Sequence, residues 1–139
     1  MTVAEDLLHQ HIETLVADNP RWQTLLADDI VWELPFAPAL GHPACVAGRA
    51  EVKKFAAWFV GAVEGFRFFD VRVQACADPE AAVAEVKGEG RIEATGRLYR
   101  QEYVVFLRAS AGKIASLREY FDPTRAARAM NAPIRDLDS

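Results

Sequence analysis

The amino-acid sequence predicts an α+β fold in which N-terminal helices pack on a strongly bent, mostly antiparallel sheet with an internal pocket. Two observations support this prediction. Apolar residues recur every three or four positions in 2–17 and 49–63, which is typical of amphipathic helices. Four segments of alternating apolar and polar residues then follow between 66 and 121, joined by short turns, which is typical of antiparallel strands. Bending the sheet around the helices buries both apolar surfaces and leaves a cone with a pocket.

The expected element order is α-α-β-α-β-β-β-β-α. Thr2 and Glu5 form a capping-box pattern that starts the first helix. Asp122 and Pro123 are placed to stop the last strand and start the last helix. The expected bounds are helices at about 2–17, 20–26, 49–63 and 124–130, strands at about 30–34, 66–77, 82–93, 98–108 and 114–121, and an apolar loop at 36–46.

Length, composition and charge limit the classes of protein to which this chain can belong. The 139 residues suit a single domain, 1–139, that is large enough to bury a core. A net charge of −4 provides no basic face for nucleic acid. No apolar run is long enough to span a membrane, and the first residues lack the pattern of a signal peptide. Cys45 and Cys76 fit reduced thiols, so we expect a cytoplasmic protein.

Charged residues in the last hairpin are the first candidates for chemistry. Glu102 and Glu119 lie at similar distances from the turn at 109–113, so they are expected near each other on one face. Inside an apolar cone, repulsion and desolvation would raise the pKa of one carboxyl toward neutrality, as general acid–base catalysis requires. Arg100 would hold or tune the pair. The alternative is a solvent-facing pair of carboxylates matched to Arg100 or Arg118.

Other candidates come from the helices and the aromatic residues. His11 lies on or beside the apolar face of the first helix and has the pKa range for proton transfer, although a structural hydrogen bond is an equal alternative. His9 lies on a different helix face, so the two histidines predict no metal site, and no cofactor is expected. The aromatic residues expected in the pocket wall are Trp32, Phe36, Phe55, Trp58, Phe59, Phe66 and Phe106. Tyr99, Tyr103 or Tyr120 could offer a hydroxyl to the ligand, and Arg100 and Tyr103 are the polar residues expected to bind substrate.

Three segments resemble a known superfamily. They are 26–35 (LADDIVWELP), 48–52 (GRAEV) and 112–123 (GKIASLREYFDP), in the order and spacing of nuclear transport factor 2-like proteins. That superfamily includes ketosteroid isomerases, SnoaL-like polyketide cyclases, limonene epoxide hydrolase and the phenazine biosynthesis A/B proteins. The sequence is most similar to the SnoaL-like and phenazine A/B-like members. The resemblance implies a cone-shaped α+β barrel, a homodimer, and an apolar pocket for a small organic molecule.

The resemblance transfers catalytic residues only in part. At two of the three functional positions of ketosteroid isomerase this chain has Leu34 and Val104, while the third falls at or near His11. The water-activating Asp of limonene epoxide hydrolase corresponds to Glu119. The acid–base Glu of the phenazine proteins falls at Arg100, two residues before Glu102.

Two hypotheses about function follow. The first is an enzyme of the isomerase, cyclase or hydrolase type that acts on a small, largely apolar molecule by cofactor-free general acid–base chemistry. The second is a non-catalytic ligand-binding or dimeric scaffold protein of the same fold. They differ in whether the carboxyls of Glu102 and Glu119 point into an open pocket.

Overall fold

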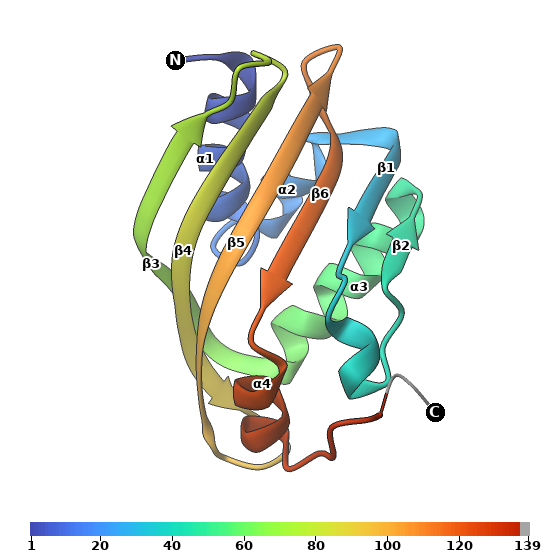
Figure 1. Ribbon diagram of the computed structural model, residues 1–139, viewed down its shortest axis with the longest axis vertical. Coiled ribbons are helices and arrows are strands. Elements are labelled where there is room, and N and C mark those ends of the chain that lie inside the picture. Colours follow the sequence, from blue (N-terminus) through green and yellow to red (C-terminus); the bar gives the residue numbers. More distant parts are fainter. Residues whose placement is uncertain (137–139) are drawn as a thin grey trace.

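A computed structural model describes residues 1–136 and contains one six-stranded curved sheet in the order β2-β1-β6-β5-β4-β3 (Figure 1). The strands are β1 (Leu26–Glu33), β2 (Cys45–Ala47), β3 (Val63–Ala75), β4 (Ala81–Ile92), β5 (Leu98–Ser110) and β6 (Lys113–Phe121). Strand β6 pairs in parallel with β1, and all other neighbouring strands are antiparallel. The predicted α+β class with a bent, mostly antiparallel sheet is confirmed.

Helices cover one face of this sheet (Figure 1). They are α1 (Val3–Thr14), α2 (Asn19–Gln23), the short 3₁₀ helix η1 (Ala37–Leu40), α3 (Arg49–Ala62) and α4 (Pro123–Met130). The capping box of Thr2 and Glu5 is present at the start of α1. Asp122 caps α4 by accepting a hydrogen bond from the backbone N–H of Thr124. These local signals confirm how both helices begin.

The hairpin of β5 and β6 decides which side chains face the helices. Its turn holds Ala111 and Gly112, both with positive φ. Along β5 the odd-numbered residues from Tyr99 to Ala109 are buried and most even-numbered ones are exposed. Val105 pairs with Glu119, so Glu119 points to the same inner face as the odd-numbered residues of β5. Glu102 therefore lies on the outer face.

The structure differs from the predicted elements around the first strand. Residues 45–47, expected within a loop, form the edge strand β2, which pairs antiparallel with 31–33 of β1. Helix α2 ends at Gln23, and Leu26 already belongs to β1. Backbone groups of a loop that lies beside a strand edge gain hydrogen bonds by pairing with that strand. Three residues without a clear alternation of apolar and polar side chains do not indicate a strand in the sequence.

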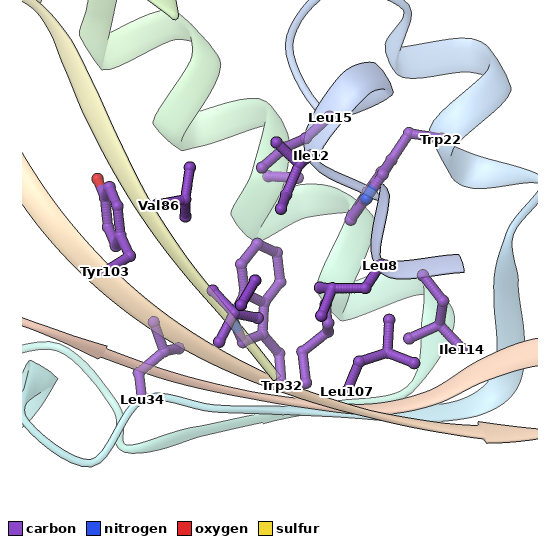
Figure 2. Packing of buried hydrophobic residues seen from close by; sticks show 14 of the residues in the cluster. Leu8, Ile12, Leu15, Trp22, Trp32, Leu34, Val86, Tyr103, Leu107 and Ile114 are labelled. Carbon is purple, nitrogen blue, oxygen red and sulfur yellow. The ribbon is translucent and has the colours of Figure 1, made fainter. Parts of the chain in front are cut away.

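The core lies between the inner face of the sheet and helices α1 and α2. The apolar stripe predicted for α1 is buried, with Leu7, Leu8, Ile12 and Leu15 at 0–7% exposure. Trp32 rises from the sheet among these α1 side chains (Figure 2). This packing fills one end of the cone and leaves the other end open.

None of the helices within residues 1–136 combines the length and hydropathy needed to cross a membrane. That residues 1–139 form a single domain stays a prediction, and its last three residues, 137–139, lie outside the described part of the chain.

Candidate functional site

A cavity of about 570 Å³ occupies the end of the cone that the core leaves open. Its lining comes from strands β1, β3, β4, β5 and β6 and from η1, α3 and α4, the last with Ala126 and Met130. Its lining is mainly apolar, and its aromatic members are Trp32, Phe55, Trp58, Phe59, Phe68, Tyr99, Tyr103 and Phe121. A cavity of this size and composition suits a small, largely apolar molecule.

Glu119, from β6, brings a carboxyl into the wall of this cavity. It is half-buried, and within residues 1–136 no hydrogen bond or ion pair holds its carboxyl. No Lys or Arg among the described residues lines the cavity. Burial without a compensating charge raises the pKa of Glu119 from 4.5 to about 8. At neutral pH the group can therefore both give and take a proton.

Two tyrosine hydroxyls lie close to this carboxyl. The Oη atoms of Tyr99 and Tyr103 are 3.0 Å apart, and Gln101 Nε2 donates a hydrogen bond of 3.2 Å to Tyr99 Oη. Burial raises the pKa of Tyr99 to about 12 and that of Tyr103 well above its usual value. The charge of a nearby ionised Glu119 raises both pKa values further. Both hydroxyls therefore stay protonated and can donate hydrogen bonds.

The cavity opens beside the end of α3. Trp58 is 45% exposed, and its ring lies 4.9 Å from that of His42, centroid to centroid. Glu93, at the turn after β4, is an exposed acidic residue of the lining. Trp58 and Glu93 are exposed members of the lining, so the cavity reaches the surface beside them.

Five of the residues predicted for the site line this cavity together. They are Glu119, Trp32, Phe55, Phe59 and Tyr103, which come from β6, β1, α3 and β5. Trp32 Nε1 is buried without a hydrogen-bond partner in the described chain. Tyr103, Trp32 and Glu119 thus bring polar groups into a wall that is mainly hydrocarbon.

Glu102 and Arg100 do not join them, which corrects the expectation of a carboxylate pair. Both lie on the outer face of β5, where the Glu102 side chain is 61% exposed and 3.7 Å from Arg125. Arg100 lies 3.7 Å from Glu89 on that face. Distance from the turn was the wrong criterion, because side-chain direction on a strand follows residue parity and cross-strand register.

Phe36 and Phe106 are also on the outer surface, where sequence reasoning placed them in the pocket wall. Phe36 packs on Tyr120 with ring centroids 5.4 Å apart. Phe106 lies 6.3 Å from the same ring and carries the Arg118 guanidinium over its face. Both phenylalanines are at least 36% exposed, so they form an aromatic patch outside the cone.

His11 is buried in the core and does not line the cavity. Its Nδ1 accepts a 2.9 Å hydrogen bond from Trp22 Nε1, and Trp32 packs on its other side with ring centroids 6.0 Å apart. Burial lowers the pKa of His11 to about 4. The structural alternative for this histidine is therefore the one that the geometry supports.

Of the other aromatic candidates, Trp58 and Tyr99 also line the cavity, whereas Phe66 packs in the core and Tyr120 lies with Phe36 on the outer face. The lining residues His42, Phe68 and Phe121 were not predicted. The sequence itself contains a signal that Tyr99 faces the cavity. Tyr99, like Tyr103, Val105 and Leu107, has an odd number, while the charged residues of β5 have even numbers. That alternation marks the odd face as the inner one.

No group of three or more His, Cys, Asp or Glu side chains within residues 1–136 is arranged to hold a metal ion. The expectation of a site without metal or cofactor stays a prediction.

Solved structures share this fold. The phenazine biosynthesis-related protein phzb2 of Pseudomonas aeruginosa superposes with a TM-score of 0.82 and 20% identity, covering 97% of this chain and 85% of that chain. RV0760c of Mycobacterium tuberculosis, solved with estradiol-17beta-hemisuccinate, gives a TM-score of 0.74 and 17% identity over 90% of this chain and 98% of its own. At these identities the likeness shows the fold alone.

Sequence relatives and a family model are more specific. The uncharacterised PhzA/B-like protein PA3332 of Pseudomonas aeruginosa is 30% identical over 125 residues, 90% of this chain and 87% of that protein. The uncharacterised protein YesE of Bacillus subtilis is 28% identical over 109 residues, 78% of this chain and 74% of its own. The family model of the SnoaL-like domain matches residues 8–117. The predicted resemblance is confirmed, and this chain belongs to the SnoaL-like domain family.

Proposed function

We propose that this protein is an enzyme that moves a proton on a small, largely apolar organic molecule held in the cavity, without cofactor or metal. The observation that carries the proposal is the carboxyl of Glu119, which lies unpaired in an aromatic cavity with its pKa raised to about 8. A pKa near the working pH suits a group that must alternate between acid and base.

A single carboxyl narrows the reaction class. Glu102 lies outside the cone and Glu93 is exposed to solvent, so Glu119 has to take a proton from one atom of the substrate and return it to another. Isomerisation, or a cyclisation that follows the same proton transfer, needs no second carboxyl. Hydrolysis would need further groups to position water, so it fits the geometry less well. Tyr103 or Tyr99 would polarise the substrate by donating a hydrogen bond.

At pH 7 a carboxyl with a pKa of about 8 is ionised in about a tenth of the molecules. If the reaction begins with proton removal, its rate therefore rises with pH until it levels off above the pKa. If it begins with proton donation, the rate falls across the same range. The direction of the pH profile thus separates the two roles of Glu119.

The test begins with a thermal-shift screen of small ketones, epoxides and hydroxylated aromatics, because a ligand that binds the folded state raises the melting temperature. Each compound that binds is then incubated with protein in D₂O, and mass spectrometry detects deuterium uptake or a new product. The Glu119→Gln variant should still fold and lose the conversion. The matched Glu102→Gln variant, altered on the outer face, should keep it.

The alternative function is a non-catalytic ligand-binding protein. The positions of Glu102 and His11 favour this alternative, because these two of the three predicted catalytic residues lie outside the cavity. Ligands that bind to the wild type without exchange or conversion would support this alternative and contradict the enzymatic proposal.

Homodimer formation and a cytoplasmic location are also part of the proposal. The exposed patch of Phe36, Phe106 and Tyr120 on the outer face of the sheet supports a dimer interface, because contiguous exposed aromatics mark contact surfaces. The free thiols of Cys45 and Cys76 support a reducing compartment. Light scattering of the wild type and of Phe106→Glu tests the dimer, which the charge should disrupt.

A further inference from the structure

Gln101 is the buried polar side chain behind the cavity wall, with 1% of its surface exposed. Its Oε1 accepts hydrogen bonds from the backbone N–H groups of Glu102 (3.0 Å) and Asp122 (2.9 Å). Its Nε2 donates to the carbonyl of Asp122 (2.8 Å) and to Tyr99 Oη (3.2 Å). Only the amide oxygen can accept from two N–H groups, so the orientation of this amide is fixed by its neighbours.

The orientation of the Gln101 amide favours one direction for the hydrogen bond between Tyr99 and Tyr103. Tyr99 Oη accepts from Gln101, so its own proton needs an acceptor, and the partner that the described structure offers is Tyr103 Oη at 3.0 Å. The head-to-tail order from Gln101 to Tyr99 to Tyr103 lets each oxygen accept once and donate once. A hydroxyl that already accepts a hydrogen bond is a stronger donor, so this order is also the cooperative one.

In this order the Tyr103 hydroxyl donates to neither Tyr99 nor any other group among residues 1–136, so its proton is left without an acceptor. The Tyr103 side chain is 6% exposed and lines the cavity, so a ligand oxygen in the cavity is the acceptor that this hydroxyl can reach. A buried donor that lacks an acceptor is costly, and a ligand oxygen placed beside it removes that cost.

We propose that Gln101 is a positioning residue that orients the two tyrosines, and that the cavity selects molecules with an oxygen acceptor, such as a ketone, ester or epoxide, beside Tyr103. This inference rests on the proposed function of the cavity as a ligand site and adds the substrate class. A molecule of the same shape without the oxygen leaves the Tyr103 proton unmatched. The expected discrimination is about tenfold in Kd, as one neutral hydrogen bond provides.

The experiment compares 2-acetylnaphthalene, which has a ketone oxygen, with 2-ethylnaphthalene, which has a similar shape and no acceptor. Isothermal titration calorimetry measures both Kd values for the wild type, and infrared spectroscopy of the ¹³C-labelled ketone reports the hydrogen bond to its oxygen. We expect the ketone to bind about tenfold tighter, with its carbonyl stretch shifted to lower frequency.

Variants then show which hydroxyl donates to the ketone oxygen and whether the hydrogen bonds run from Gln101 to Tyr103. Tyr103→Phe should abolish both the preference and the frequency shift. Tyr99→Phe and Gln101→Met should leave a preference of about threefold and a smaller shift, because the Tyr103 hydroxyl then loses its fixed orientation. Tyr120→Phe, on the outer face, is the matched control and should change neither value.

Each outcome decides between the claims. If neither naphthalene binds to the wild type, the cavity is not a ligand site for such molecules and the proposed function fails together with the inference. If both bind with equal Kd, the cavity stands as a ligand site and acceptor selection is refuted. If Tyr99→Phe, which keeps the bonds between Gln101 and Asp122, leaves the ketone's frequency unchanged, the directing chain is refuted even if Gln101→Met fails to fold. Loss of the shift in Tyr99→Phe but not in Tyr103→Phe would reverse the direction and contradict the proposal.

Discussion

Replacing Glu119 by Gln should make the stability of the protein less dependent on pH. In the folded state burial raises the pKa of this carboxyl from 4.5 to about 8, while in the unfolded chain the carboxyl keeps its ordinary pKa. Between these two values the folded state binds more protons than the unfolded state. The free energy of unfolding therefore falls as pH rises through this window. Glutamine cannot ionise, so it removes this source of pH dependence.

The magnitude follows from the two pKa values. At about 1.4 kcal/mol per pKa unit, the full shift corresponds to a loss of roughly 4 to 5 kcal/mol in the free energy of unfolding. Most of this loss occurs between about pH 5 and pH 9. Glu119 is half-buried and faces a cavity that water can enter, which reduces the penalty. We therefore expect Glu119→Gln to be more stable than the wild type by about 2 to 4 kcal/mol at pH 9, and nearly equal to it at pH 5.

Urea unfolding followed by tryptophan fluorescence measures this difference at several pH values. Glu102→Gln is the matched control, because that carboxylate is on the outer face beside Arg125, and its pH dependence should follow that of the wild type. Parallel curves for Glu119→Gln and the wild type from pH 5 to pH 9 would refute a buried, unpaired carboxyl at position 119.

Three further predictions concern stability. Burial lowers the pKa of His11 to about 4, so as the pH falls the unfolded chain binds a proton at this residue before the folded protein does. Between pH 7 and pH 4 the free energy of unfolding should therefore fall by about 3 kcal/mol more for the wild type than for His11→Gln. Equal losses in urea titrations would contradict this. Gly88→Ala should cost about 1 to 3 kcal/mol, because a Cβ there would collide with the ring of Phe66, whereas Gly61→Ala, which meets nothing within 4 Å, should be neutral or stabilising in thermal melts. Asp122→Ala should cost about 1 kcal/mol and speed hydrogen exchange in the first turn of α4; unchanged exchange would show that the cap is not needed.

The fold could be predicted because its signals are local. The capping pattern of Thr2 and Glu5, the turn at Gly112 and the stop at Asp122 each act within a few residues, and the structure has all three. The alternation of apolar and polar residues in the two hairpin strands was equally visible in the sequence. The edge strand β2 was missed because three residues carry no periodicity and pair only through contacts with β1.

The site was harder to predict because it depends on strand register. Glu119 lines the cavity, but Glu102 was paired with it by counting from the turn, and residue parity places the two on opposite faces of the sheet. His11 was ambiguous in sequence, since an apolar helix face can meet either a pocket or a core. The hydrogen bond from Trp22 that decides the matter comes from another helix.

The account depends most directly on the protonation of Glu119 in the folded protein. A ¹³C NMR titration of the glutamate side-chain carboxyls, assigned by comparison with Glu119→Gln, measures it without a ligand. We predict that one carboxyl resonance, absent from that variant, titrates with a pKa of about 8. A Glu119 resonance that titrates near the ordinary pKa of 4.5 would contradict the central claim.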